Sequence, residues 1–303
     1  MSESTASLRR KIGTAGDLQG VVRTMKALAA SSIGQYEASV RALADYYRTV
    51  ELGLGVCFRR VEASSGARAE ASPPPDAPAI GAVVFGSDQG LVGQFNDIVA
   101  DFAIDRLAAL PGKPRVWAVG ERVRGRLADA GLLLQEPLSV PSSVSGIIPL
   151  VGRILVDSAA AQIGSSSSEL HLFHNRPTSQ ATYEPVSQRL LPLDDRWRRE
   201  LSEHPWPTHA LPEVMGGVDA TLRTLIDEHL FISLFRACAE SLASENASRL
   251  AAMERADKNI DDLLDELNAT FHRLRQTSID EELFDVLSGF EALSESRGGG
   301  ARF

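Results

Sequence analysis

The chain is short of cysteine and of long apolar runs. It has two cysteines, Cys57 and Cys238, too few for a disulfide framework or a four-cysteine metal site, so a reducing compartment is expected. No window approaches the roughly 18 uncharged apolar residues of a membrane-spanning helix, and the N-terminus lacks the apolar centre of a secretory signal. The sequence therefore predicts membrane association only through partner proteins.

A global basic field is also absent. The formal net charge is -9, which excludes the electrostatic footprint of a protein that binds nucleic acid or anionic lipid. The charge is unevenly spread, however. Residues 1–60 hold nine Arg or Lys against five Asp or Glu, whereas residues 219–293 hold seven against sixteen. The two ends of the chain are therefore electrostatically complementary.

Proline is missing from about residue 5 to residue 60, where apolar residues recur with a period of seven. One row is Val22, Ala29, Tyr36, Leu43, Val50 and Cys57, and a second row, offset by four, is Ile33, Val40, Tyr47 and Leu54. Such rows form a stripe along one side of a long helix. A repeat of seven over this length implies left-handed supercoiling around a partner helix.

Proline is missing again from residue 219 to about residue 293, and the same period returns. The row is Leu225, Ile232, Ala239, Asn246, Met253, Ile260, Leu267 and Leu274. A continuous helix here would be on the order of 110 Å long at about 1.5 Å per residue. Asn246 either fixes the register of a buried seam or marks a part of the rod that is not tightly paired. The two stretches predict an antiparallel two-helix coiled coil.

Between these arms the pattern changes to alternating strands and helices. Strand-like runs at 80–85, 115–119 and 169–174 alternate with helical segments at 93–109, 121–130 and 147–163, and 182–193 could add an edge strand. The predicted fold class is α/β, with a small, mainly parallel, Rossmann-like domain and a long antiparallel two-helix coiled coil. The expected divisions are an N-terminal arm at 1–60, a flexible linker at 61–79, the α/β domain at 80–213, a C-terminal arm at 214–293 and a disordered tail at 294–303.

The stretch GSDQGLVGQFN, residues 86–96, raises the question of a nucleotide site. Its glycines, Gly86, Gly90 and Gly93, follow a strand but lack the G-x-G element of a dinucleotide fingerprint, and no P-loop lysine follows. Glu121 after the second strand could mimic a ribose-binding acid, so a stand-alone nucleotide-dependent enzyme stays open as an alternative. A structural turn between strand and helix is the favoured interpretation.

Other catalytic patterns are weak. His171 and His174 are three residues apart on one predicted strand, so their side chains point to opposite faces and are poor joint metal ligands. The sequence predicts no catalytic residue, no cofactor-binding residue and no metal ligand.

Three stretches together resemble the gamma subunit of rotary F-type ATP synthases, over nearly the full chain. The first is LRRKIGTAGDLQGVVRTMKALAAS, and the second is GSDQGLVGQFN, similar to the family's Ser-Asp-x-Gly-Leu-Cys-Gly-x-Phe-Asn signature. The third is SENASRLAAMERADKNIDDLLDELNATFHRLRQTSIDEELFDVLSG. Val92 stands at the cysteine of the signature, a departure that suggests a divergent form, of the kind an alternative F-type complex would contain.

This resemblance implies a non-catalytic rotor shaft. It would couple ion-driven rotation of a membrane c-ring to ATP synthesis or hydrolysis at sites on the alpha and beta subunits. The implied partners are the alpha and beta subunits, the epsilon subunit and the c-ring, without nucleic acid. The implied location is peripheral, on the cytoplasmic side of the cell membrane. A static coiled-coil scaffold is a further alternative.

The resemblance also implies contact residues. Arg275 and Gln276 match a pair that in the family hydrogen-bonds a loop of the beta subunit. Met25, Lys26 and Arg249 match positions that face the beta subunit lower on the shaft, although Met25 could instead be rod packing and Arg249 a solvated residue. A subunit-contact loop of the α/β domain is expected at Ser87, Asp88, Gln89, Gly90 and Leu91.

Overall fold

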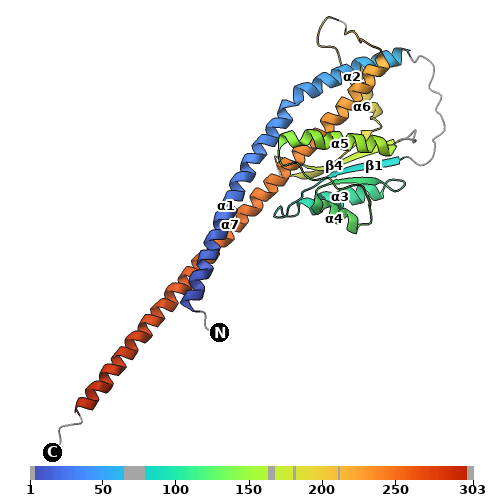
Figure 1. The fold of residues 1–303 in the computed structure, drawn as a ribbon. Coiled ribbons are helices and arrows are strands. Elements are labelled where there is room, and N and C mark those ends of the chain that lie inside the picture. The colour runs from blue at the N-terminus through green and yellow to red at the C-terminus, as the bar shows by residue number, and fades with distance from the viewer. Residues whose placement is uncertain (1–3, 65–78, 163–167, 180–181, 211, 299–303) are drawn as a thin grey trace, which may run out of the picture. The chain divides into compact units, whose positions relative to one another are not determined.

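The computed structural model describes residues 4–64, 79–162, 168–179, 182–210 and 212–298. Long helices stand at both ends of the chain, and a strand-and-helix domain lies between them in sequence (Figure 1). In chain order the elements are α1 (Thr5–Ala42), α2 (Ala44–Ser64), β1 (Ala79–Phe85), α3 (Phe95–Ala108), β2 (Arg115–Val119), α4 (Glu121–Asp129), β3 (Leu133–Leu134), α5 (Val144–Gln162), β4 (Ser168–Arg176), β5 (Glu184–Leu191), α6 (Asp195–Glu203) and α7 (Val218–Gly298).

The five strands form one sheet in the order β3-β2-β1-β4-β5. β1 pairs in parallel with β2 and β4, and β2 pairs in parallel with β3. β5 pairs antiparallel with β4 and forms one edge of the sheet. The predicted mainly parallel α/β domain is therefore confirmed.

Helices cover both faces of this sheet. Successive side chains of a strand point to opposite faces, so β1 contributes to two separate cores. Val84 packs with α3 and α4, including Leu127, whereas Phe85 packs with Ile147 of α5 and Leu234 of α7. Figure 1 shows α3 and α4 on one side of the sheet and α5 on the other. Both faces carry buried side chains, as is typical of a parallel sheet.

The chain divides into two compact units, Leu28–Ala252 and the pair Met1–Ala27 with Met253–Phe303. In the second unit, α1 and α7 run antiparallel. Gln19 donates a hydrogen bond from Nε2 to Asp261, and Arg23 donates from Nε to Asp257 over 3.2 Å, so a later residue of α1 meets an earlier residue of α7. The charge complementarity of the two arms thus takes the form of basic side chains on α1 facing acidic ones on α7.

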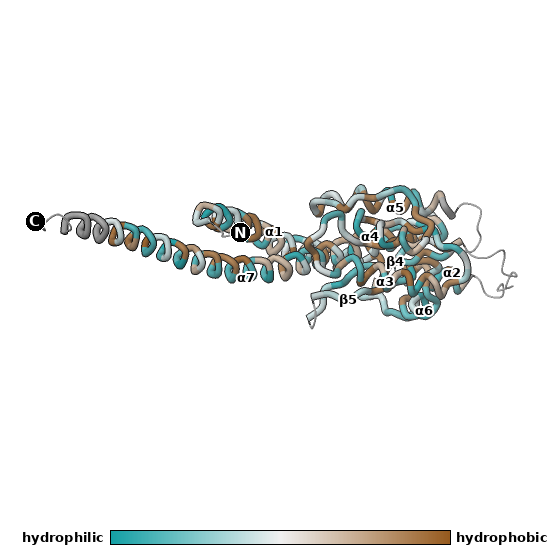
Figure 2. Tube along the Cα trace, turned by 90° about the horizontal axis from the view of Figure 1, so that it is seen from below, coloured by the Kyte–Doolittle hydropathy of each residue, from teal (hydrophilic) through white to brown (hydrophobic). Residues whose placement is uncertain are grey.

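The apolar residues that recur every seven positions lie on the buried sides of the long helices. On α1 and α2 the buried members of the first row are Val22, Ala29, Tyr36, Val50 and Cys57. On α7 they are Ile232, Ala239, Asn246, Met253 and Ile260, while Leu267 and Leu274 are half-buried. Figure 2 shows apolar residues recurring among hydrophilic ones along α7. The coiled-coil pattern read from the sequence therefore identifies the covered side of each arm.

The N-terminal arm is two helices rather than one. α1 ends at Ala42 and α2 begins at Ala44, with Leu43 between them. The hydrogen bonds continue through this point, since Leu43 N donates to Ser39 O and Tyr47 N donates to Leu43 O. The break is therefore a bend, and beyond it Val50, Leu54 and Phe58 pack in a cluster of their own with side chains of α6 and α7.

The sequence predicted no helix or strand after residue 193 in the α/β domain, but Asp195–Glu203 form helix α6. The signal for its start is Asp194, whose Oδ1 accepts hydrogen bonds from Arg196 N at 2.8 Å and Trp197 N at 3.0 Å, as an N-cap does. The two-residue strand β3 was not predicted either.

At the other end, α7 continues to Gly298, past residue 294 where the tail was expected to begin. Most of the expected linker, 65–78, and the last tail residues, 299–303, lie outside the described residues. No helix in the described part of the chain is long and apolar enough to cross a membrane.

Candidate functional site

The glycine motif forms the connection from β1 to α3, at the carboxyl ends of the parallel strands. This is the edge at which doubly wound folds bind ligands. Gly93 has a positive φ of 56°, and so has the non-glycine Leu91, at 62°. At Gly86 a side chain would collide with Val123 of α4, so the glycine there allows helix and strand to pack closely.

The carboxylate of Asp88 lies at the N-terminus of α4, the helix that follows β2. Its Oδ1 accepts a hydrogen bond from the backbone N–H of Glu121, the first residue of α4, at 3.0 Å. Its Oδ2 accepts from the backbone N–H of Val140 at 2.9 Å. Helix N-termini attract anions, and here the anion belongs to the chain itself. Glu121, the candidate ribose acid, therefore lies beside a carboxylate that already takes its N–H.

Ser87 is held from several directions. Its N–H donates to Asn96 Oδ1 at 2.9 Å, the Asn96 amide donates back to Ser87 Oγ at 2.8 Å, and Ser87 Oγ donates to the carbonyl of Gln89. Ser87 is fully buried. Of the five residues expected to form a contact loop, Ser87 thus lies inside the domain, Asp88 and Gly90 are half-buried, and Gln89 and Leu91 are exposed.

The loop is also attached to α7. Ser248 donates a hydrogen bond from Oγ to the carbonyl of Val92 at 2.5 Å. Residues 86–92 are therefore fixed to the sheet domain by Asp88 and Ser87 and to the long helix by Ser248.

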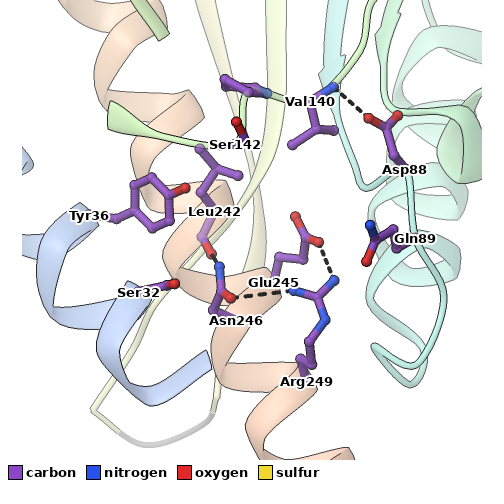
Figure 3. A pocket seen from close by; sticks show the side chains of 11 residues that line it. Ser32, Tyr36, Asp88, Gln89, Val140, Ser142, Leu242, Glu245, Asn246 and Arg249 are labelled. Carbon is purple, nitrogen blue, oxygen red and sulfur yellow. Dashed lines mark hydrogen bonds and ion pairs between the residues drawn. The ribbon is translucent and has the colours of Figure 1, made fainter. Parts of the chain in front are cut away.

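Arg249 makes its bonds within its own helix. Its Nη2 lies 2.6 Å from Glu245 Oε1, and its Nη1 donates to Asn246 Oδ1 at 3.3 Å (Figure 3). The side chain is 14% exposed. Asn246 also donates to the carbonyl of Leu242 at 2.8 Å, so the polar member of the row of seven has its amide satisfied by α7. Arg249 is neither a free surface charge nor a solvated residue.

The other expected contact residues lie in the unit formed by the outer parts of α1 and α7. Met25 and Lys26 are half-buried, and Lys26 Nζ lies 3.8 Å from Asp257 Oδ2. Arg275 and Gln276 are exposed on α7, and neither side chain has a partner among the described residues. The structure thus leaves Arg275 and Gln276 available to another molecule.

Sequence reasoning missed a buried cluster centred on Glu240 of α7. Its Oε2 lies 2.8 Å from His174 Nε2 and 3.1 Å from Arg176 Nε, and its Oε1 lies 2.7 Å from Arg236 Nε. The Glu240–Arg236 spacing of four residues is visible in the sequence, but the approach of β4 is not. Among the described residues, no group of three or more His, Cys, Asp or Glu side chains could hold a metal ion.

These observations define a class of protein, a parallel α/β domain inserted between two long helices that pair antiparallel. The sequence pattern of the ATP synthase family matches residues 4–293, and the chain belongs to this family. The family recognised in the sequence is thereby confirmed.

Individual relatives cover almost the whole chain. The ATP synthase gamma chain of Moorella thermoacetica is 26% identical over 292 residues, covering 94% of this chain and 98% of that relative. The ATP synthase gamma chain of Desulforamulus reducens is 25% identical over 301 residues, covering 96% of this chain and 99% of that relative.

Solved structures share the fold at lower identity. A chain of the Euglena gracilis mitochondrial ATP synthase, in an assembly of OSCP, F1 and c-ring, has a TM-score of 0.63 and 15% identity, covering 99% of this chain and 98% of that one. A chain of the Tetrahymena thermophila mitochondrial ATP synthase, in its central stalk and c-ring, has a TM-score of 0.57 and 21% identity, covering 78% of this chain and 99% of that one.

Proposed function

We propose that this chain is the gamma subunit, the central rotor shaft, of an F-type ATP synthase. The observation that carries the proposal is the family match over residues 4–293, which includes both long helices as well as the sheet domain. Relatives named ATP synthase gamma chain align over nearly their whole length. A coiled coil that spans both ends of the chain is the element a shaft needs, because torque must pass along its length.

In this role the chain couples two processes and catalyses neither. Rotation of a membrane c-ring turns the shaft, and the shaft's asymmetric surface favours a different conformation in each beta subunit. Coupling then follows from the difference in binding free energy between rotational states. The partners are the alpha and beta subunits, the epsilon subunit and the c-ring. The chain would lie on the cytoplasmic side of the cell membrane and reach it through these partners.

The glycine loop supports the non-catalytic role. Asp88 places a carboxylate at this edge of the sheet, where it already takes the N–H groups of Glu121 and Val140 and would repel the phosphates of a nucleotide. We assign ATP binding to the alpha and beta subunits. The loop serves as the junction between the α/β domain and α7, and its exposed Gln89 and Leu91 are its proposed subunit contacts.

Arg275 and Gln276 are the proposed contacts with the beta subunit near the end of α7, because both are exposed and unpaired within the described chain. A guanidinium presents a fork of donors that suits a carboxylate on a neighbouring loop. Met25 and Lys26 are proposed contacts lower on the shaft. Arg249 is a weaker one, because Glu245 and Asn246 already hold its guanidinium. The arms are proposed to comprise residues 1–60 and 214–293, on either side of the α/β domain at 80–213.

Co-purification tests the proposal. Affinity-tagged chain, expressed in its own cells and extracted in mild detergent, should bring down alpha, beta and epsilon subunits and the c-ring. A matched control carries the same tag on the chain without residues 271–298, which lacks the end of α7 but keeps its core residues, and should recover less of the alpha and beta subunits. Recovery of the full-length chain without alpha or beta subunits would refute the rotor role. Stoichiometric, tight binding of ATP or NAD by the isolated chain would favour the stand-alone enzyme instead.

A further inference from the structure

A small cavity lies beside the Glu240 cluster, between α7 and the edge of the sheet formed by β4 and β5. Its volume is about 40 Å³, and its polar lining includes His174, Arg176, Gln188, Arg236 and Glu240. All of these residues belong to one compact unit of the chain. A water molecule needs roughly 10–15 Å³, so the space admits an ion of a few atoms and is far smaller than a nucleotide.

Two guanidiniums at this cavity have donors to spare. Arg176 and Arg236 each donate from Nε to a different oxygen of Glu240, over 3.1 Å and 2.7 Å. Glu240 thereby orients both groups, and their Nη atoms make no hydrogen bond to the described residues. The two side chains are 41% and 52% exposed, so a dissolved ion can reach these donors. Two positive charges against one carboxylate favour an anion.

His174 adds a requirement that distinguishes one anion from another. The side chain is 2% exposed, and its Nδ1 is a buried atom with no hydrogen-bond partner among the described residues. Burial lowers the pKa of His174, although Glu240 opposes this shift, so the ring is neutral near pH 7. Nε2 lies 2.8 Å from the ionised Glu240 and carries the ring proton, because a carboxylate only accepts. Nδ1 is then an acceptor, and a ligand that satisfies it must donate a hydrogen bond.

These groups together select one chemical class. Guanidinium Nη atoms bind the oxygens of an oxyanion, and Nδ1 accepts from a hydroxyl. Near pH 7 inorganic phosphate carries at least one proton on an oxygen, whereas sulfate carries none. We propose that this cavity binds a small oxyanion that carries a proton, with hydrogen phosphate as the representative. Such an ion supplies acceptors to Arg176 and Arg236 and a donor to His174, whose unpartnered Nδ1 is otherwise an exception among buried polar atoms.

The first experiment titrates the purified full-length chain with inorganic phosphate at pH 7 and constant ionic strength, and follows the broadening of the phosphorus NMR signal. We expect a dissociation constant on the order of 1 mM. Sulfate, added as a competitor, should displace phosphate at least about tenfold less effectively, because it cannot donate to Nδ1. Absence of phosphate binding would overturn the proposal, and so would equally effective competition by sulfate.

Substitutions on β5 locate the site. Gln188→Glu adds a carboxylate to the cavity wall at an exposed position and should weaken phosphate binding at least about tenfold. Ser187→Glu adds the same charge at the neighbouring exposed position, whose side chain points to the opposite face of the sheet, and should weaken binding much less. Circular dichroism checks the fold of each variant. Equal binding by the two variants would refute the site, because phosphate would then respond only to the net charge of the chain.

A third variant tests Nδ1. His174→Gln keeps an amide N–H for Glu240 but has no acceptor at the position of Nδ1, so it should bind phosphate and sulfate about equally. A preference for phosphate that persists in this variant would contradict the role of His174. Arg236→Gln removes one half-exposed guanidinium and should weaken both anions alike, which tests the site independently if His174→Gln does not fold. None of these measurements needs a partner subunit, so failure of the rotor assignment would leave their results intact.

Discussion

His174 of β4 and Glu240 of α7 lie 2.8 Å apart, Nε2 to Oε2, in the interior of the sheet domain. Arg176 and Arg236 complete the surroundings of this carboxylate. Burial alone would raise the pKa of Glu240, but hydrogen bonds from His174 and Arg236 outweigh burial and lower it to about 2. The cluster thereby attaches the central sheet to the long helix through one ionised side chain.

Replacing Glu240 by Gln should destabilise the chain by about 2 kcal/mol, because one buried carboxylate serves three donors. The pKa of Glu240 is lower in the folded chain than its ordinary value of 4.5. Its stabilisation is therefore complete above about pH 4.5 and is lost as the pH falls towards about 2. Urea unfolding from pH 7 to pH 3 measures this. The exposed Glu200→Gln is the control, and equal pH profiles for wild type and Glu240→Gln would contradict the prediction.

His229 of α7 packs against two aromatic rings and should make the chain sensitive to weak acid. Its ring centroid is 4.7 Å from that of Trp197 and 5.8 Å from that of Tyr47, and its Nδ1 has no partner among the described residues. Burial lowers its pKa to about 4, from an ordinary value of 6.5. The neutral ring therefore contributes stability that is complete above about pH 6.5 and is lost as the pH falls towards 4.

His229→Phe keeps the aromatic packing and removes the titration. Between pH 7.5 and pH 5 we expect the wild type to lose about 2 kcal/mol more unfolding free energy than this variant. Chemical denaturation at the two pH values gives the difference directly. The exposed His209→Phe should behave as wild type. A variant whose loss between the two pH values equals that of wild type would show that His229 is not the titrating group.

Asp88→Ala should destabilise the α/β domain by about 2 kcal/mol, because the N–H groups of Glu121 and Val140 lose their acceptor. Asp88→Asn keeps one acceptor oxygen and should cost less. Thermal unfolding of the full chain measures both variants against Asp105→Ala, which removes an exposed carboxylate from α3. If Asp88→Ala unfolds at the wild-type temperature, the carboxylate does not hold the loop.

The helical arms could be predicted from the sequence because a period of seven is a local property of the chain. The rows that contain Val22 and Ile260 identified the covered sides of α1 and α7 without knowledge of the partner. The bend at Leu43 could not be predicted in this way, since the hydrogen bonds continue through it and no proline or glycine marks it. At this bend the N-terminal arm stops packing against the sheet domain and begins to pack against α6.

The candidate site was only partly predictable, because its contacts join distant segments. The glycine motif correctly indicated a turn after β1, but the partners of Asp88 are 33 and 52 residues away. Glu245 and Arg249, four residues apart on one helix, could have been paired from spacing alone. That this pair lines a cavity with Tyr36 follows only from the folding of α1 against α7.

Arg275 and Gln276 provide the most direct test of the shaft's contact with the head. Both side chains are exposed, and neither has a partner in the described chain, so Arg275→Ala with Gln276→Ala should leave the unfolding temperature unchanged. If Arg275 donates to a beta-subunit carboxylate, losing a charge-assisted bond of about 1.5–3 kcal/mol should lower coupled turnover about tenfold or more.

ATP-driven ion uptake into membrane vesicles measures coupled turnover, with ATP hydrolysis recorded in parallel. Arg273→Ala is the matched control, because it removes the same kind of exposed side chain from the same part of α7. A loss in the double variant but not in Arg273→Ala locates the contact at Arg275 and Gln276. Equal turnover in all three proteins would mean that torque reaches the beta subunit through other residues, since a broken contact cannot leave the coupling free energy unchanged.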